Sequence, residues 1–238
     1  MKLLFFIATN QRHEIANKCF RGLHRIIEHA QDVLPDIEVD VFVIVSNQTA
    51  AALALAHGFK ISTIIPNMPL GKKMNEGLRQ AMEDLDWDYL IQSGDDNLYG
   101  TDLIVRYAYE IGQGTKFFGL SRLYFYDLYS NRIKVFGSNQ VFGAGRVIAR
   151  SLLEHMPKVW PDAINKGLDN ASEKAITDFH GFDKVRVKPV NFSQLPYVID
   201  IKTEHNIHSF QDVPGDQVDE DWIFDDIQTK FPEVWKNQ

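Results

Sequence analysis

Asp95, Asp96 and Asn97 follow directly after an apolar segment, in the sequence LIQSGDDN of residues 90–97. Adjacent carboxylates repel one another, and a hard divalent cation such as Mg²⁺ or Mn²⁺ relieves that repulsion when their oxygen atoms ligate it. The same residue types are also typical of a tight turn, which needs no metal. This segment therefore indicates either metal-assisted handling of phosphate or a simple turn, and the elements around it have to distinguish the two.

The composition is that of an ordinary globular chain, with 238 residues of which 45% are hydrophobic and 24% charged. This length suits one substantial α/β domain. A net charge of −7 argues against a protein that covers nucleic acid with a broad basic surface. The only cysteine in the sequence, Cys19, excludes an internal disulfide framework and a cysteine-based zinc site.

The apolar segment at the start of the sequence, residues 2–8, indicates a buried strand rather than a signal peptide, because it is short and no small-residue cleavage site follows. No segment has the ~18 apolar residues that a membrane span needs. With a single cysteine as well, the reducing cytoplasm is the compartment that we expect.

Strands and helices are predicted in alternation along the first half of the chain. Strands are expected over residues 2–8, 38–45, 61–65 and 89–93, and helices over residues 14–34, 49–57, 72–85 and 101–111. Such βα units in series predict an α/β fold with a doubly wound, mostly parallel sheet and helices on both faces. Functional residues in these sheets lie at the carboxyl ends of the strands, so the relevant loops are residues 9–12, 46–47, 67–73 and 94–97.

The second half of the chain has a different pattern. Between residues 117 and 142, aromatic and β-branched residues alternate with polar ones around the turn-like residues 129–131, which predicts a hairpin and a smaller antiparallel section. Residues 143–146 (GAGR) are expected to open a helix over residues 147–153. Later strands are expected over residues 184–191 and 198–202, and a partly helical acidic segment over residues 216–235.

Three segments, in this order, resemble the nucleotide-sugar glycosyltransferases of the GT-A fold, in particular the family-2-like group: PLGKKMNEGL (69–78), DYLIQSGDDN (88–97) and GAGR (143–146). The resemblance extends over residues 2–210, and the order of the short motifs carries it. It implies a Rossmann-like GT-A fold in one domain, with a nucleotide-sugar-binding half (1–98), an acceptor and catalytic half (99–210) and a C-terminal segment (211–238).

The resemblance also implies a metal site, because a bound Mn²⁺ or Mg²⁺ stabilises the departing nucleoside diphosphate. Asp96 is the expected ligand and Asp95 is expected to contact the donor ribose or the metal, although the two roles are interchangeable. Asn97 replaces the commoner third aspartate of the family; its amide oxygen still ligates a hard cation. His205 and His208 are similar in position to a histidine that completes the metal shell in several GT-A enzymes, and surface histidines are the alternative interpretation.

The donor-binding residues that this resemblance implies lie in the predicted loops and at the start of one helix: Thr9, Asn10, Arg12, Ser46, Asn47, Lys72, Lys73 and Asn75, together with Asp95. Thr9 and Asn10 also suit the role of helix caps, and the same alternative applies to Ser46 and Asn47. A lysine in the first turn of a helix opposes the helix dipole unless an anion such as a phosphate lies near it, so Lys72 or Lys73 is expected to contact the donor. A solvated lysine is the alternative.

The acceptor side is expected in the glycine-rich loop and in the predicted helix that follows later. Asp169 lies where an inverting enzyme of this kind places its general base, and Glu173, one helical turn later, is its rival. Either acidic residue also suits a plain helix N-terminus. The loop residues expected to border the sugar or the acceptor are Gly143, Ala144, Gly145 and Arg146.

The predicted function is therefore metal-dependent transfer of a sugar from a nucleoside diphosphate to a hydroxyl acceptor, with inversion implied by the resemblance alone. A sugar nucleotidyltransferase is an alternative, although residues 8–12 lack the glycine-rich sequence that would cradle a triphosphate. A catalytically inactive binding module with the same fold is another. The acceptor class stays open among saccharide, lipid-linked glycan, protein and modified nucleic-acid base.

Overall fold

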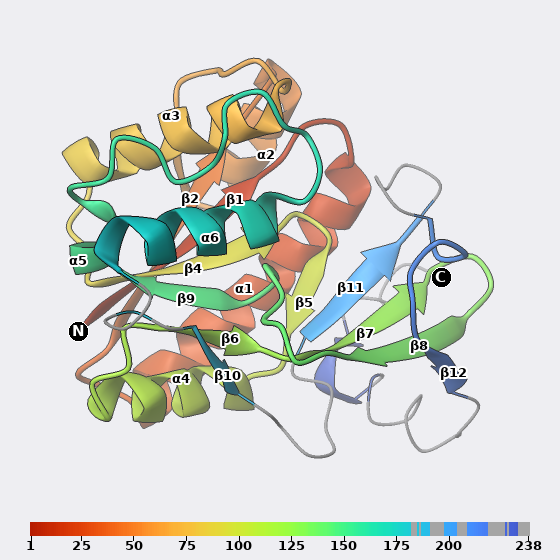
Figure 1. Cartoon of the computed structure of the whole chain (residues 1–238). Helices are drawn as coiled ribbons and strands as arrows, with labels where there is room; N and C mark the ends of the chain where they lie inside the picture. Colours follow the sequence, from red (N-terminus) through yellow and green to blue (C-terminus); the bar gives the residue numbers. More distant parts are fainter. Residues whose placement is uncertain are drawn as a thin grey trace.

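A larger sheet with helices on both faces and a smaller sheet beside it form the molecule (Figure 1). The computed structural model describes residues 1–181, 185, 187–190, 198–203, 209–218, 227 and 229–232. Within these residues the larger sheet has seven strands in the order β10-β6-β9-β4-β1-β2-β3. Their bounds are β1 Lys2–Ala8, β2 Glu38–Ile44, β3 Lys60–Ile61, β4 Tyr89–Gly94, β6 Phe117–Leu120, β9 Arg146–Ala149 and β10 Lys188–Val190.

Strands β4, β1, β2 and β3 are parallel, as the alternation of strands and helices predicts, and β9 runs antiparallel to β4 and β6. The helices that the structure describes over their whole length are α1 His13–Val33, α2 Gln48–Ala56, α3 Leu70–Asp84, α4 Asp102–Gly112, α5 Arg150–Leu153 and α6 Leu168–His180. The predicted helices over residues 14–34, 49–57, 72–85 and 101–111 are thus confirmed to within two residues at each end.

The apolar run of β1 is continuous because helices cover both faces of the sheet. Leu3, Phe5 and Ile7 pack with residues of α1, α2 and α4, whereas Leu4 and Phe6 pack with residues of α3, α5 and α6. All five side chains are at most 1% exposed. Burying each of them stabilises the fold by about 2 kcal/mol, so β1 anchors the centre of the sheet.

The smaller sheet contains, in the described residues, five strands in the order β12-β8-β7-β11-β5. The hairpin predicted around residues 129–131 is confirmed as β7–β8, with Asn131 in the left-handed conformation at its turn (φ 51°). Strand β11 is parallel to β7 and antiparallel to β5. The bounds are β5 Asn97–Tyr99, β7 Arg122–Asp127, β8 Arg132–Gly137, β11 Val198–Lys202 and β12 Asp216–Val218.

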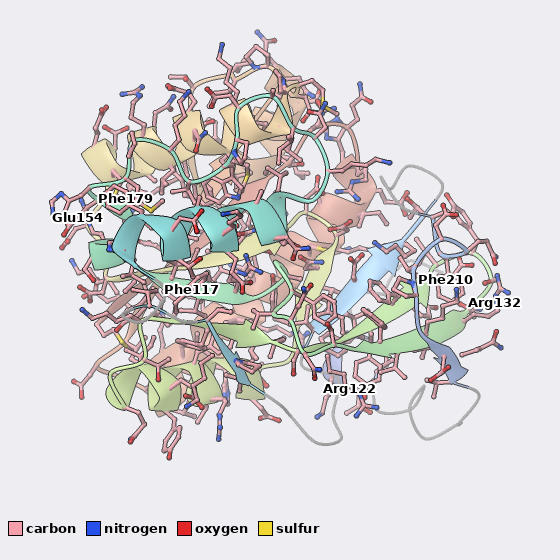
Figure 2. The ribbon with its side chains drawn as sticks, viewed as in Figure 1. Phe117, Arg122, Arg132, Glu154, Phe179 and Phe210 are labelled. Carbon is pink, nitrogen blue, oxygen red and sulfur yellow. The ribbon has the colours of Figure 1, made fainter. Side chains whose placement is uncertain are left out.

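A segment near the end of the described chain packs against β8. The ammonium of Lys134 donates hydrogen bonds to three backbone oxygens of this segment, including those of Phe210 at 2.9 Å and Val213 at 3.1 Å. The guanidinium of Arg132 lies 5.1 Å from the Phe210 ring centre, and both residues are labelled together in Figure 2. These contacts fix residues 209–213 at the edge of the smaller sheet.

The helix predicted over residues 147–153 is wrong in its first half, because Arg146–Ala149 form β9 and α5 begins at Arg150. Val147 and Ile148 are β-branched, and each buries its side chain on a different face of the sheet. The hydrogen bonds to β4 and β6 exist only in the assembled sheet, so local sequence gave no sign of them.

Other predicted boundaries also change. The strand expected over residues 61–65 is confined to Lys60–Ile61, and Phe117–Leu120 joins the larger sheet rather than the hairpin. Residues 184–191 contribute β10. Residues 216–235 begin as β12 and are helical at Ile227, Thr229 and Lys230, in line with the predicted partly helical segment. Within the described ranges, no helix combines the length and apolar character required to cross a bilayer.

Candidate functional site

A cleft of about 950 Å³ lies at the carboxyl ends of β1 and β4, where Ala8 and Gly94 stand side by side in the sheet register. Its walls come from the loop after β1, the turn after β4 and the N-terminal turns of α3 and α6. Strands β7, β8 and β11 of the smaller sheet close the other side. The cleft thus occupies the position that a doubly wound sheet predicts for a functional site.

The guanidinium of Arg12 bridges the two adjacent carboxylates at the end of β4. Its Nη1 lies 2.5 Å from Asp96 Oδ2, and its Nη2 is bonded to Asp95. The hydroxyl of Thr9 donates a 2.7 Å hydrogen bond to Asp95 Oδ2. All four residues line the cleft, Thr9, Arg12, Asp95 and Asp96. Their donor-binding and metal-binding roles stay predictions.

A tight turn holds the two carboxylates, as the turn interpretation predicts. Asn97 accepts a 2.7 Å hydrogen bond from the backbone N–H of Gly94. A Cβ atom on Gly94 would overlap the carboxylate of Asp96, which explains why glycine precedes the pair. The amide of Asn97 is therefore engaged in shaping the turn while the residue also borders the cleft.

Burial and neighbouring charges shift the pKa values of the acidic groups of this cleft in different directions. Burial raises the pKa of Asp95 above its usual value, although Arg12 opposes this. Burial also acts on Asp96, but the attraction of Arg12 and Lys202 outweighs it and lowers the pKa of Asp96. Burial and repulsion from Asp96 raise the pKa of Asp200 to about 7. Asp96 is therefore the carboxylate best kept ionised.

Asp200 and Lys202 are cleft residues that the sequence analysis did not select. They form an ion pair with a distance of 2.9 Å between Lys202 Nζ and Asp200 Oδ1. Strand pairing places Asp200 opposite Asn97, and the N–H of Ile201 donates to the backbone oxygen of Asp96. The available signal was the sequence VIDIK of residues 198–202, in which two charged residues occupy one face of an apolar strand.

Lys73 is almost fully buried, and it is the one of the two lysines that borders the cleft. Its ammonium donates to the backbone oxygen of Thr9 at 2.7 Å and to Asn67 Oδ1 at 3.1 Å. Burial lowers its pKa to about 8, despite the attraction of Asp95. Lys73 therefore fixes the loop after β1 through its bond to the Thr9 oxygen.

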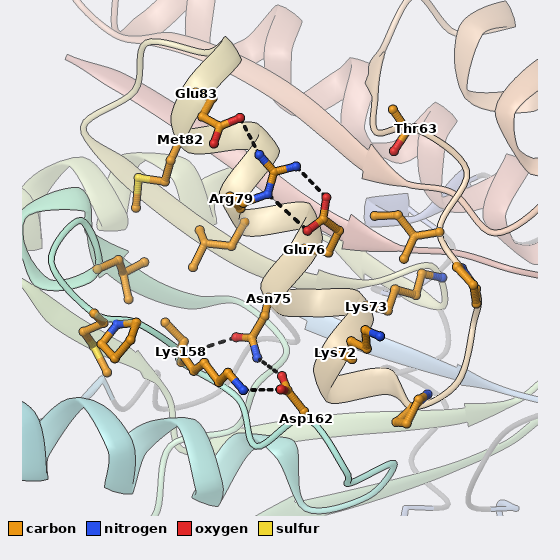
Figure 3. Close-up of a pocket in the computed structure, with 18 of the residues that line it drawn as sticks. Thr63, Lys72, Lys73, Asn75, Glu76, Arg79, Met82, Glu83, Lys158 and Asp162 are labelled. Atoms are coloured by element: carbon orange, nitrogen blue, oxygen red, sulfur yellow. Dashed lines mark hydrogen bonds and ion pairs between the residues drawn. The ribbon is translucent and has the colours of Figure 1, made fainter.

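Lys72 and Asn75 lie outside this cleft, in a second groove of about 720 Å³ along α3 (Figure 3). The side-chain amide of Asn75 donates to Trp160 O and Asp162 Oδ1, and its oxygen accepts from the N–H groups of Val159 and Trp160. Asn75 thus holds the loop of residues 159–162 in place. Several charges of this groove pair with one another, as for Lys158 with Asp162.

Ser46 and Asn47 also lie outside the cleft. Asn47 caps α2 by accepting a 2.8 Å hydrogen bond from the N–H of Ala50, and its amide donates to the backbone oxygen of Asn10 at 2.6 Å. It therefore orients the cleft-lining residue Asn10 from behind. The buried hydroxyl of Ser46 has no hydrogen-bond partner within the described residues.

Asp169, in the first turn of α6, lies on the opposite wall of the cleft. Its Oδ2 accepts a 3.0 Å hydrogen bond from the N–H of Gly143, and its Oδ1 accepts a 3.1 Å bond from the amide of Gln92. A Cβ atom on Gly143 would overlap this carboxylate. Gly143 and Ala144 border the cleft, as predicted for the glycine-rich loop.

Arg146 is fully buried and ties that loop to α6. Its guanidinium donates to the backbone oxygens of Asp169 and Val141, both at 2.6 Å, and lies 3.4 Å from the carboxylate of Glu173. Burial lowers the pKa of Arg146. Glu173 thus faces a buried arginine, whereas Asp169 faces the cleft. Gly145 needs its glycine because φ is +77° there.

An apolar wall of the cleft, made by Leu123, Phe125, Phe136 and Phe142, comes from β7, β8 and the segment after it. The rings of Phe136 and Phe142 meet edge to face, with centres 5.7 Å apart. Tyr124 and Tyr126 alternate with these residues and pack into a separate core. His205 and His208, the predicted histidine ligands, lie outside the described residues.

The described residues supply carboxylate and amide oxygens to the cleft but no group of three or more His, Cys, Asp or Glu side chains arranged around a metal position. The hard oxygen atoms of Asp95, Asp96 and Asn97 fit Mn²⁺ or Mg²⁺ by type. Arg12 occupies both carboxylates, so a cation bound to Asp96 has to share or replace that contact.

Comparison with solved structures shows what this fold is similar to, whereas no family model and no curated protein sequence matches the chain. Residues 1–349 of S. aureus TarS, in complex with UDP-GlcNAc, align with a TM-score of 0.60 and 15% identity over 99% of this chain and 67% of that one. This chain spans 37% and 60% of two other TarS structures.

The mannosyltransferase PcManGT from Pyrobaculum calidifontis, in complex with GDP-Man and Mn²⁺, aligns with a TM-score of 0.57 and 12% identity over 87% of this chain and 58% of that one. Glucosyl-3-phosphoglycerate synthase from Mycobacterium tuberculosis, in complex with Mn²⁺ and UDP-glucose, aligns with a TM-score of 0.52 and 13% identity over 88% of this chain and 73% of that one. At these identities the likeness concerns the fold. The chain therefore has a GT-A-like fold, and the predicted fold class is confirmed.

Proposed function

We propose that this protein transfers a sugar from a nucleoside diphosphate donor to a hydroxyl acceptor, with a divalent cation and with inversion at the anomeric carbon. One observation carries the proposal: a single cleft holds the Asp95–Asp96 pair on one wall and the hydrogen-bonded carboxylate of Asp169 on the other. Three proteins with similar folds are in complex with UDP-GlcNAc, with GDP-Man and Mn²⁺, and with UDP-glucose and Mn²⁺.

The charge of the cleft supports a requirement for a cation. Its described lining contains five carboxylates, Asp95, Asp96, Asp169, Asp200 and Asp212, and three cationic side chains, Arg12, Lys73 and Lys202. Even with Asp200 partly protonated at neutral pH, because its pKa is about 7, the acidic groups outnumber the cationic ones and this lining offers a diphosphate little net attraction. A bound Mn²⁺ or Mg²⁺ supplies the missing positive charge and Lewis-acid stabilisation of the leaving diphosphate. Asp96, whose pKa is lowered, would hold the cation together with Asp95 or Asn97.

On the donor side, Arg12 and Thr9 lie in the loop after β1, beside the carboxylate pair. With a cation held by Asp96, the guanidinium of Arg12 would contribute a second positive charge to a diphosphate bound beside the carboxylate pair. Lys73 keeps this loop in place through its bond to the Thr9 oxygen. The backbone of Thr9 thus has a fixed position against which the nucleotide is oriented.

On the acceptor side, Asp169 takes the proton of the attacking hydroxyl. As the hydroxyl oxygen bonds to the anomeric carbon, the bond from that carbon to the diphosphate breaks and the nucleoside diphosphate leaves. The apolar wall of Leu123, Phe125, Phe136 and Phe142 borders the same cleft, so the acceptor presents an apolar face to these side chains.

The experiment is a screen of nucleoside diphosphate sugars with Mn²⁺ or Mg²⁺, followed by detection of the released nucleoside diphosphate with and without candidate acceptors. We expect release with one donor, and none in excess EDTA. Release of pyrophosphate from a nucleoside triphosphate and a sugar phosphate would indicate a nucleotidyltransferase instead. Donor binding without any release across the acceptor classes would indicate a binding module.

A further inference from the structure

Gln92 links the strand that carries the acidic pair to the carboxylate on the opposite wall. It lies on β4, three residues before Asp95, and is 8% exposed. Its Nε2 donates a 3.1 Å hydrogen bond to Asp169 Oδ1, and its backbone oxygen accepts a 2.9 Å bond from the N–H of Gly145. Because an ionised carboxylate only accepts hydrogen bonds, the NH₂ group has to face Asp169.

The other half of this amide has an unfavourable environment. The oxygen Oε1 of Gln92 is buried and has no hydrogen-bond partner within the described residues. Leaving a buried acceptor unpaired costs about 1–3 kcal/mol, and an apolar side chain of similar size would avoid that cost. Glutamine differs from such an apolar side chain in donating the hydrogen bond to Asp169.

The carboxylate of Asp169 is thereby held at both oxygens. Gly143 donates to Oδ2 from the glycine-rich loop, and Gln92 donates to Oδ1 from the sheet. Two donors on different elements fix the plane of the carboxylate. Arg146, from β9, bonds to the backbone oxygen of Asp169 and interacts electrostatically with the carboxylates of both Asp169 and Glu173.

We propose that Gln92 is a positioning residue that orients the Asp169 carboxylate toward the acceptor hydroxyl, a role that rests on the proposed function. Strand β4 then positions both the acidic pair and the base, because Asp95 and Asp96 follow its last residue and Gln92, within it, holds the Asp169 carboxylate. A rigid central strand keeps the distance between the leaving group and the base constant, which is what an in-line displacement needs.

The test compares two substitutions of Gln92 in the full chain. Gln92→Met keeps the length of the side chain and removes the N–H group that bonds to Asp169. We expect kcat to fall by about 10²-fold, while the dissociation constant of the nucleotide sugar stays within about twofold. Gln92→Glu is nearly isosteric and places a second carboxylate beside Asp169. The acid limb of its kcat/KM profile should move up by about one pH unit or more.

Gln80 is the matched control, because it is a glutamine of the same low exposure, 7%, whose amide bonds to Thr63 away from the cleft. Gln80→Glu and Gln80→Met should leave the pH profile in place, even where they lower the melting temperature. An unmoved acid limb in Gln92→Glu, with an active wild type, overturns the role of Gln92 alone. A wild type that transfers no sugar at any pH overturns the proposed function together with this role.

Discussion

Arg12 is the central residue beside the acidic pair, because its one guanidinium forms ion pairs with two buried carboxylates, those of Asp95 and Asp96. It lowers the pKa of Asp96, and it opposes the effect of burial on Asp95. A divalent cation that binds Asp96 therefore competes with Arg12 for the same oxygen atoms. This competition makes a prediction that does not depend on turnover.

We expect Arg12→Met to raise the affinity for Mn²⁺ alone by about tenfold, which corresponds to ~1.4 kcal/mol, because the competing cation is gone. Affinity for a nucleoside diphosphate should fall, since its guanidinium partner is lost. Breaking the partly buried pairs also destabilises the fold by up to ~3–5 kcal/mol, so binding is measured by calorimetry well below the melting temperature.

Arg79→Met is the matched control, because Arg79 is an exposed arginine that also bridges two carboxylates, those of Glu76 and Glu83, outside the cleft. It should change neither affinity. Weaker Mn²⁺ binding in Arg12→Met would show that Arg12 supports the cation instead of competing with it.

Asp169 and Glu173 give a second prediction at the scale of single residues. Asp169→Asn should reduce transfer by about 10²-fold or more while donor and Mn²⁺ still bind, because the amide accepts no proton. Glu173→Gln should keep transfer near the wild-type rate, since Glu173 faces Arg146 outside the cleft. The measurement is initial rate at saturating donor, and a reversed order of the two variants would assign the base to Glu173.

The helix α3 shows how an element assigns roles to neighbouring residues. Successive helical residues point about 100° apart, so Lys73 enters the cleft while Lys72 is exposed beside the groove along α3. Burial of Lys73 has a measurable effect on stability. Burial lowers its pKa in the folded protein to about 8, from the 10.5 of a lysine in water.

Between these two pH values the unfolded chain binds more protons at this position than the folded protein, so stability rises with pH. We expect the unfolding free energy of the wild type, relative to Lys73→Met, to increase from pH 8 to pH 10.5 by up to ~3 kcal/mol. Urea titrations across this range provide the measurement. A constant difference would show that Lys73 titrates normally in the fold.

At the scale of the whole molecule, the cleft joins two sheets, and a ligand that bridges them stabilises the folded state. The correct nucleotide sugar with Mn²⁺, each at about 100 times its dissociation constant, should add ~2.7 kcal/mol. For a chain of this size the melting temperature then rises by about 5–10 °C. A thermal-shift screen identifies the donor by this rise.

Asp96→Asn should lose most of that shift, whereas Asp32→Asn, at an exposed aspartate of α1, should keep it. Addition of EDTA should have the same effect as Asp96→Asn. An undiminished shift in EDTA would mean that nucleotide binding needs no cation.

Much of the fold follows from local sequence. The continuous apolar run of β1 and the helical spacing of α1 and α3 depend on neighbours along the chain, so their positions were predicted correctly. The place of the acidic pair was also predictable, because Asp95 and Asp96 follow an apolar strand in a βα series.

Only the tertiary structure decided the remaining points. Residues 146–149 form a strand because β4 and β6 provide its hydrogen bonds, and no local signal reports those partners. Lys73 differs from Lys72 through the face of α3 that packing turns toward the cleft. Asp169 and Glu173 share a face of α6 and differ in their position along it, because only the first turn of α6 borders the cleft. Asp200 and Gln92 reach the cleft because distant strands meet there. Sequence specifies which residues could act, and long-range packing selects which of them share one cleft.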